Sequence, residues 1–342
     1  MKRETMKFLG KAVLFLAIFA MLLAPLQQLL ERKSLSGPWD MSNKVGGFYN
    51  EPEDEFDLMF FGSSHAYAAF SPLRLWEDTG VKSYVFATQQ QPLWATYTYL
   101  KEAFKTQRPQ AVVVELNMTV IGDEQPKDSV NYSALDYLPM SWNKVQLAWN
   151  SGENLENRTA LLFNIFKYHS RWSELKREDF TYDPDTLRDP YKGYVLLTKA
   201  RAEQARPDIT GVTDRTAISE KKMYWLQQIV DLCKEEQVEL LFLKSASNLS
   251  AEEKAMLNTV EDFAAENGIT FHDFNEDYDA IGLNGKMFYD EHHLDGTGAA
   301  LFTDYFARWL MEQGIDFKTD PDNADWAAAA AQYDAELAKQ SA

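Results

Sequence analysis

Short apolar runs alternate along the chain with segments in which apolar residues recur every three or four positions. Five runs predict buried β-strands, at residues 56–61, 83–87, 111–116, 238–244 and 269–274. Helical spacing predicts helices at residues 93–105, 220–236, 250–267 and 298–313. Ser71-Pro72 opens a further helix, because serine is a good N-cap and proline suits the first helical position. This alternation predicts an α/β fold with a central, mostly parallel sheet.

The N-terminus carries a continuous apolar run over residues 12–26, interrupted only by Pro25 and preceded by basic residues. With residues 8–10 included, the run is about 19 residues long, just enough to span a bilayer. A cleavable signal peptide is the alternative, but no small-x-small cleavage site follows. We therefore expect an uncleaved transmembrane helix. The basic residues place the N-terminus in the cytoplasm and the chain from about residue 30 onward outside it.

The remaining chain divides into four predicted parts. After the anchor (residues 1–30), residues 31–55 are polar with scattered Gly and Pro, which indicates a stalk. Residues 56–318 form the α/β domain. Within it, residues 123–215 break the strand and helix rhythm and predict an insertion or cap. Residues 319–342 form an Ala-rich acidic tail that could be helical.

Composition excludes several classes of function. The 342 residues are 45% hydrophobic, ample for a buried core, and the formal net charge of −18 argues against binding nucleic acid. The single cysteine, Cys233, excludes an intrachain disulfide and a cysteine-rich metal site. Since it lies on a predicted helix, we expect a buried structural thiol.

Candidate chemistry lies at the carboxyl ends of predicted strands, where ligands of open α/β sheets bind. In Asp290-Glu291-His292-His293, the Asp290 carboxylate can accept a hydrogen bond from Nδ1 of His293, which leaves Nε2 free as a base. Ser64 follows the first strand and is a candidate nucleophile. The alternatives are a helix-capping or turn serine and a surface or capping histidine.

Gly62-Ser63-Ser64 and Asp290-x-x-His293 resemble the first and last blocks of the SGNH/GDSL hydrolase superfamily, a resemblance that spans most of residues 55–313. The chain looks most similar to the membrane-anchored branch with DltD-like and alginate-acetylation-type proteins, which act on cell-envelope polymers. The resemblance implies a flavodoxin-like three-layer sandwich. It also implies Ser64 as nucleophile, His293 as general base and then acid, and Asp290 as the group that orients the imidazole. Ser63 replaces the family's aspartate.

The oxyanion hole departs from the family pattern. Ser64 N–H can supply one donor, and the family's Gly-x-Asn-Asp block keeps only its asparagine here, Asn117. No second-block glycine is evident, and its place holds three consecutive glutamines. Gln90 is our preferred donor among them, although a backbone N–H or a simple polar loop fits equally well.

Three further residues are candidates for substrate binding. His65 could tune Ser64 or line a pocket, or could serve only helix packing. His169 and Arg171 lie among aromatics, a mixture suited to a sugar or phosphate. The alternative is an amphipathic helix at residues 163–175, with Arg171 paired to a nearby glutamate. The neighbouring His292 and His293 make a metal site an alternative, but Glu291, Asp295 and His65 form no recognised ligand motif with them, so we expect no metal and no cofactor.

Two functions fit these patterns. The first is a membrane-anchored, extracytoplasmic serine esterase or O-acyltransferase that acts on a cell-envelope glycan or teichoic polymer. The family resemblance adds a membrane-bound O-acyltransferase as a candidate partner. The second is a non-catalytic, polysaccharide-binding or scaffolding module, consistent with the incomplete oxyanion blocks.

Overall fold

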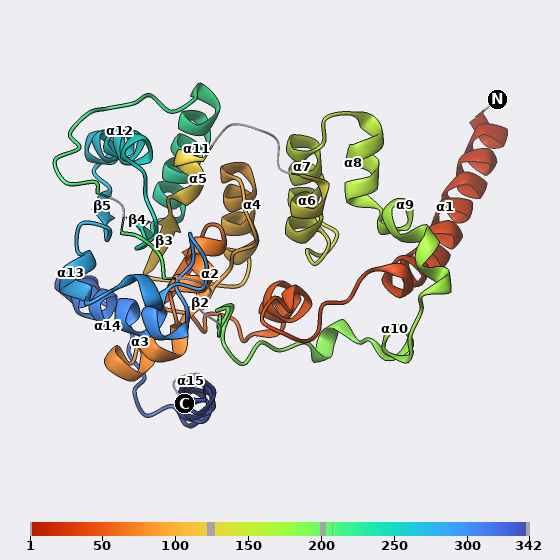
Figure 1. Ribbon diagram of the computed structural model, residues 1–342. Coiled ribbons are helices and arrows are strands. Elements are labelled where there is room, and N and C mark those ends of the chain that lie inside the picture. Colours follow the sequence, from red (N-terminus) through yellow and green to blue (C-terminus); the bar gives the residue numbers. More distant parts are fainter. Residues whose placement is uncertain (1, 122–126, 199–202, 207, 340–342) are drawn as a thin grey trace.

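The computed structural model describes residues 2–121, 127–198, 203–206 and 208–339 (Figure 1). Residues 123–126, 199–202 and 207 of the predicted insertion, and the last three residues of the tail, lie outside the described residues. Five strands form one parallel sheet in the order β2-β1-β3-β4-β5. They are β1 (Leu58–Phe61), β2 (Ser83–Val85), β3 (Ala111–Glu115), β4 (Glu239–Lys244) and β5 (Thr270–Asp273). This is the flavodoxin-like order. The predicted α/β fold is confirmed.

Helices cover both faces of the sheet, which explains why β1 is apolar throughout and β3 is apolar up to Glu115, rather than alternating. In Figure 1, α3 (Pro72–Thr79) and α14 (Gly296–Glu312) pack together below the sheet. Above it lie α4 (Leu93–Ala103), α11 (Glu220–Glu236) and α12 (Ala251–Asn267). Short helices follow several strands and loops: α2 (Ser64–Ala69), α5 (Asn117–Val120), α13 (Tyr278–Ile281) and the 3-10 turn η5 (Gly285–Met287).

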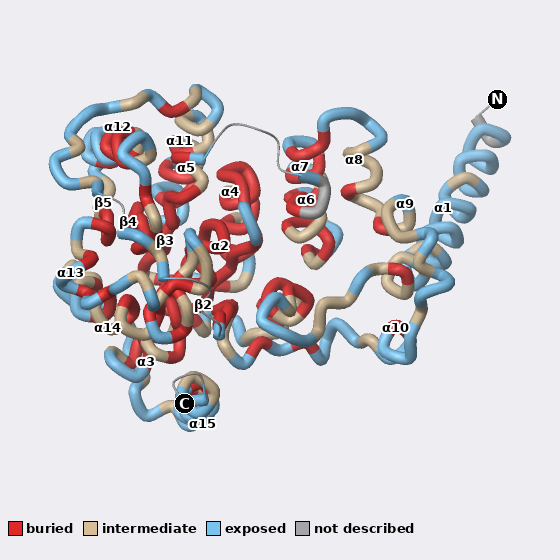
Figure 2. Tube along the Cα trace, in the orientation of Figure 1, coloured by how far each residue is buried: buried red, intermediate tan, exposed pale blue. Residues whose placement is uncertain are grey.

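The first helix, α1 (Lys2–Leu30), is the predicted apolar N-terminal helix. Its segment Glu4–Leu30 is long and apolar enough to cross a membrane, and none of its most apolar stretch is buried inside the molecule. Figure 2 shows the helix as largely exposed. Phe8, Phe15 and Leu22 are each more than three-fifths exposed, so a bilayer is the environment that would cover them.

The segment predicted as a stalk packs against the α/β domain instead. It forms a π-helical turn, η1 (Ser42–Gly46), and a 3-10 turn, η2 (Gly47–Asn50). Val45 and Phe48 are 1% exposed, and the Phe48 ring stacks on Phe86 with 4.1 Å between centroids. The apolar residues here are too few and too irregularly spaced to reveal a helix or strand, so the sequence pattern hides their burial. The folded domain therefore begins well before residue 56.

The predicted insertion is a helical layer between α4 and α1 (Figure 1). Its elements are α6 (Asp128–Leu135), α7 (Trp142–Ser151), α8 (Leu155–Leu162), α9 (Asn164–Tyr168), η3 (His169–Ser173), α10 (Arg177–Thr181) and η4 (Pro184–Thr186). Helix α7 packs on α4, and α9 packs on α1. The layer thus connects the apolar helix to the sheet domain.

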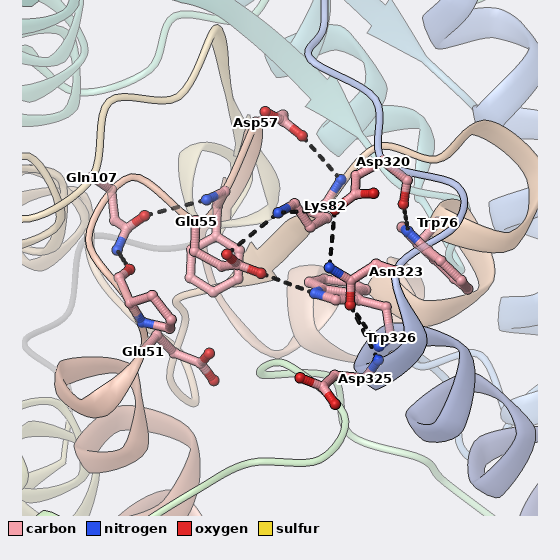
Figure 3. Close-up of polar contacts among 12 residues, drawn as sticks. Glu51, Glu55, Asp57, Trp76, Lys82, Gln107, Asp320, Asn323, Asp325 and Trp326 are labelled. Atoms are coloured by element: carbon pink, nitrogen blue, oxygen red, sulfur yellow. Dashed lines mark hydrogen bonds and ion pairs between the residues drawn. The ribbon is translucent and has the colours of Figure 1, made fainter.

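The acidic tail forms α15 (Ala324–Ala338), which packs against α3. Figure 3 shows how its start is held: Trp326 Nε1 donates to Glu55 at 3.0 Å, and Trp76 Nε1 donates to the Asp320 carbonyl at 2.8 Å. Trp326 and Tyr333 are buried. The tail is consequently part of the domain and not an appendage.

Candidate active site

Ser64 lies at the start of α2, where β1 turns directly into a helix. Gly62 makes this turn possible, because its φ of 143° lies in a region that side chains disfavour. A Cβ at Gly62 would also lie 3.0 Å from Glu115 Cβ and 3.1 Å from the Glu115 carbonyl oxygen. The glycine therefore allows the serine turn to pack tightly on the end of β3.

The two adjacent serines have different environments. Ser63 is the N-cap of α2, and its fully buried hydroxyl accepts the His65 backbone N–H at 3.4 Å. Ser64 points its Oγ to His293, with 2.7 Å to Nε2. The capping role considered for Ser64 is thus filled by Ser63, and Ser64 Oγ is bonded to His293 instead.

The Asp290 carboxylate holds the His293 ring on its other side. His293 Nδ1 lies 2.8 Å from Oδ1 and 3.0 Å from Oδ2 of Asp290. Oδ1 also accepts the backbone N–H groups of His292 and His293, at 2.9 and 3.0 Å. Burial alone would raise the pKa of Asp290, but these hydrogen bonds lower it to about 2. The carboxylate stays charged and favours the tautomer that has its proton on Nδ1.

Backbone contacts fix the loop that carries both residues. Tyr289 N–H donates to the His293 carbonyl at 2.8 Å, closing a tight turn. Asp295 then caps α14 by accepting the Gly298 N–H at 2.9 Å. The loop is therefore held between a turn and a capped helix, which positions His293 against a serine 229 residues away.

Ser64, Asp290 and His293 line a cavity of about 440 Å³. Ser34, Trp39 and Met41 contribute a wall from the segment that follows α1. Ser133 and Tyr137, from the helical insertion, contribute another wall, as does Tyr67, one turn after Ser64 on α2. Burial raises the pKa of Tyr67, so its phenol stays protonated.

The oxyanion candidates differ in their placement. The backbone N–H of Ser64 is in the first turn of α2, where no intrahelical acceptor exists. Gln89 lines the cavity, whereas Gln90, with φ 45° and an exposed side chain, does not occur among the described residues that line it. Gln91 is buried and bonded to Thr88 and Thr96.

Asn117 starts α5 directly beyond the end of β3. It is 7% exposed, and its backbone N–H donates to Glu115 Oε2 at 3.0 Å. It too is absent from the described cavity lining. Of the three predicted donors, only Ser64 therefore lines the cavity.

His65 lies behind the cavity, in a buried charged cluster. Lys244 Nζ lies 3.0 Å from Glu115 Oε1 and 3.4 Å from His65 Nδ1, and both ends of the ion pair are fully buried. Ser245 Oγ donates to the same carboxylate at 3.1 Å. Burial and the Lys244 charge hold the pKa of His65 well below its usual value. His65 is not part of the described cavity lining, but its ring lies 5.1 Å from the His293 ring between centroids.

The other two predicted substrate-binding residues lie near the end of α1. His169 is exposed, with Nδ1 3.2 Å from the Phe166 carbonyl. Arg171 donates to the Leu30 carbonyl at 2.8 Å and to Asp179 at 2.7 Å, not to the glutamates considered from the sequence. Arg171 therefore stabilises the junction between α1 and the insertion.

Neither a metal site nor a reactive thiol is present in the described part of the chain. No group of three or more His, Cys, Asp or Glu residues within that part could hold a metal ion. His292, considered as a ligand, is exposed next to His293. Cys233 is buried, which raises the pKa of its thiol to about 12.

Sequence reasoning missed most of the cavity wall. Tyr67 is three residues after Ser64, a spacing that places both on one helix face, so it could have been found. Glu115 and Lys244 are charged residues at the ends of apolar strands. This pattern could have predicted the buried charged cluster behind the cavity. Trp39 and Tyr137 carry no such signal, because only tertiary packing brings them to Ser64.

No protein-family model matches the chain, and no curated protein matches it. Among solved structures, the chain is similar to one described as a gut microbial diltiazem-metabolizing enzyme, with 12% identity and a TM-score of 0.38. The similarity covers 80% of this chain and 49% of that structure, so this chain spans about half of its length. Because this likeness is so distant, any inference about chemistry rests on the site itself.

Proposed function

We propose that the protein is a membrane-anchored serine esterase or O-acyltransferase that works through an acyl-enzyme on Ser64. The observation that carries the proposal is the continuous hydrogen-bonded chain from Ser64 Oγ through His293 to Asp290. A buried serine, a histidine and a carboxylate in this order form the arrangement that activates a hydroxyl for acyl transfer.

The reaction uses each group in turn. His293 Nε2 accepts the Ser64 hydroxyl proton as Oγ attacks the ester carbonyl of the acyl donor. The negative charge on the carbonyl oxygen is stabilised by the Ser64 N–H and by Gln89, the glutamine that lines the cavity. Collapse expels the donor alcohol, which takes the proton from His293, and leaves an ester on Ser64.

The second half of the reaction decides between esterase and transferase. Water or a sugar hydroxyl gives its proton to His293 and attacks the Ser64 ester. His293 then returns this proton to Ser64 Oγ as the bond to the acyl group breaks and an acid or a new ester leaves. Tyr67, Tyr137 and Trp39 give the cavity aromatic walls that would limit access of water. This lining supports transfer to a polymer hydroxyl such as that of a cell-envelope glycan or teichoic polymer.

The position of the cavity supports an acyl donor at the membrane. Ser34 lines the cavity and is four residues after the end of α1. Four residues reach at most about 14 Å, so the cavity rim lies within that distance of the end of the apolar helix. With the helix across a membrane and the domain outside the cytoplasm, a membrane-bound O-acyltransferase could deliver the acyl group directly.

A second candidate function is a non-catalytic, polysaccharide-binding or scaffolding module. The observation that favours it is the absence of Asn117 and Gln90 from the described cavity lining. An oxyanion site with one donor fewer loses about 2.7–4 kcal/mol of transition-state stabilisation.

Intact-mass spectrometry after incubation with p-nitrophenyl acetate separates the two functions. We expect one acetyl adduct on Ser64 that is absent from Ser64→Ala and forms slowly in His293→Ala. Ser63→Ala is the matched control and should still be acetylated, because Ser63 only caps α2. No adduct in the wild-type chain, with p-nitrophenyl acetate and with a fluorophosphonate, would favour the binding module.

A further inference from the structure

A second concave site lies between the sheet domain and the insertion. It is a groove of about 610 Å³ between α4, α7 and α11, within the size range of ligand pockets, roughly 300–1,000 Å³. The three helices lie beside one another in Figure 1. None of the described residues that line this groove also lines the cavity at Ser64.

One face of α7 is dedicated to the groove. Trp142, Gln146, Trp149 and Asn150 follow the spacing of a single helix face. The residues between them, such as Leu147, are buried in the domain. Trp142 is 73% exposed and Trp149 is 53% exposed, which is costly for such large apolar rings without a ligand. The helix thus packs by one face and presents two tryptophans by the other.

The opposite wall is also aromatic and well ordered by ring contacts. Tyr97 from α4 contacts Trp225 from α11, with 5.5 Å between ring centroids, and Tyr224 lies 5.2 Å from Trp225. On the α7 side, the Arg158 guanidinium lies 4.3 Å from the Trp149 ring centroid. These contacts restrain the rings of Tyr97, Trp225 and Trp149, which lowers the conformational entropy that they would lose when a ligand binds.

The polar groups of the groove are mostly neutral amides. Gln146, Asn150 and Gln228 line it, together with Lys101, whose ammonium donates to Gln146 at 3.0 Å. Amides both donate and accept, as sugar hydroxyls do, so the two pair reciprocally. A phosphate ligand would instead call for several cations. No carboxylate occurs among the described residues of the lining.

We propose that this groove binds an extended β-1,4-linked glycan chain. Flat aromatic rings contact the apolar C–H faces of sugar rings while the amides bond to the hydroxyls at their edges. Trp142 and Trp149 are seven residues apart, roughly 10.5 Å along the helix axis. This spacing is close to the length of one disaccharide unit in an extended β-1,4-linked chain.

The groove would hold the polymer beside the acylation site. Gln89 lines the Ser64 cavity just before α4 begins, and Tyr97 and Lys101 lie farther along the same helix. The 11 residues of α4 are roughly 16 Å long, so one polymer chain can reach both sites. That the bound glycan is the acceptor of the acyl group rests on the proposed function. Glycan binding itself does not require the chemistry at Ser64.

Calorimetric titration of the full-length Ser64→Ala protein tests the proposal independently of catalysis. The protein is kept in a polyoxyethylene detergent, since sugar detergents would compete for the groove. Cellohexaose and chitohexaose are the probes, and the α-1,4-linked maltohexaose is the comparison. We expect saturable binding of at least one β-linked probe and at least about ten-fold weaker binding in Trp142→Ala and Trp149→Ala.

Trp172→Ala is the matched control, because Trp172 is equally exposed at 72% but does not line the groove. It should bind like the parent. When Ser64 is intact, Trp142→Ala and Trp149→Ala should leave the acetylation of Ser64 by p-nitrophenyl acetate unchanged. The proposal would be overturned if neither β-linked probe binds up to about 10 mM, or if maltohexaose binds equally well. It would also be overturned if neither tryptophan substitution weakens binding.

A photo-crosslinking residue in place of Val145, which lines the groove and leaves both tryptophans intact, then identifies the occupant in cells. Capture of polysaccharide supports the proposal, and capture of a protein or a lipid overturns it. Acetylation of Ser64 without glycan binding would refute glycan binding by the groove but leave the proposed function supported. Glycan binding without acetylation would do the reverse.

Discussion

At the scale of single residues, one oxygen of the Asp290 carboxylate both shapes its loop and orients the His293 ring. Oδ1 accepts two backbone N–H groups that shape the loop and also the ring N–H of His293. Its pKa is lowered from 3.8 to about 2, so its stabilising contribution is complete above pH ~4 and is lost as the pH falls through about 2. Loop structure and imidazole orientation therefore depend on one charge.

Asp290→Asn should preserve the loop structure but disturb the protonation of the His293 ring. The amide can present an oxygen to the backbone but favours the His293 tautomer that has its proton on Nε2, which cannot accept from Ser64. We expect acetylation of Ser64 to slow by about 10³–10⁴-fold, measured as the p-nitrophenolate burst. Glu291→Gln, an exposed neighbour, is the control and should react normally. A normal burst in Asp290→Asn would remove the aspartate from the mechanism.

A second residue-scale prediction concerns the buried pair of Lys244 and Glu115, whose side chains are both 0% exposed. Lys244→Met leaves an unpaired carboxylate in the core and should lower the free energy of unfolding by about 3–5 kcal/mol. Adding Glu115→Leu should restore only part of this loss, because the Asn117 N–H and the Ser245 hydroxyl then lack their acceptor. Denaturant unfolding measures both, with Arg215→Met as an exposed-pair control that should change little. A small effect of Lys244→Met would mean that water reaches the cluster.

At the scale of elements, the turn between β1 and α2 sets the position of Ser64. Gly62→Ala places a side chain at φ 143° and 3.0 Å from Glu115 Cβ. It should lower the free energy of unfolding by about 1–3 kcal/mol and also slow acetylation, because Ser64 is two residues away. Gly282→Ala is the control: its φ of 85° also lies in the left-handed region, but nothing lies within 4 Å. It should lose stability without losing reactivity.

The elements that the sequence predicted are those with a regular apolar pattern. All five strands lie within or near the predicted runs, because both faces of a parallel sheet are buried and most strand residues are apolar. The edge strand β5 is only partly buried and includes His272 and Asp273. The spacing Asp290-x-x-His293 and the glycine-serine turn also made the pairing of distant segments foreseeable. Residues 31–55 and the cavity walls were not foreseeable. Phe48 lies in polar surroundings, and its burial depends on contacts far along the chain. Trp39 stays 44% exposed and lines the cavity only because the fold brings it beside Ser64.

At the scale of the whole molecule, three chain segments that look peripheral in the sequence complete the domain. The segment after α1 covers the sheet edge near Phe86 and lines the cavity. The insertion links α4 to α1, and the tail packs on α3. The molecule therefore has one continuous core that extends almost to the apolar helix, which leaves little free linker between that helix and the cavity.

This continuity predicts a sharp difference between two truncations. A chain of residues 31–342 keeps Met41, Val45 and Phe48 in the core, so it should be monodisperse and unfold cooperatively. A chain of residues 56–342 loses all three. Removing a single buried Phe or Met side chain already costs about 2–5 kcal/mol, against a typical total stability of about 5–15 kcal/mol.

We therefore expect the 56–342 chain to be aggregated or to melt far below the 31–342 chain, as measured by circular dichroism and size-exclusion chromatography. The 31–342 chain should retain acetylation of Ser64, because all described cavity residues remain. The full-length chain alone should resist alkaline extraction from membranes, through α1. If both truncated chains melt alike, residues 31–55 behave as the stalk that their polar composition indicates. Ser34, Trp39 and Met41 would then not form a fixed wall of the cavity.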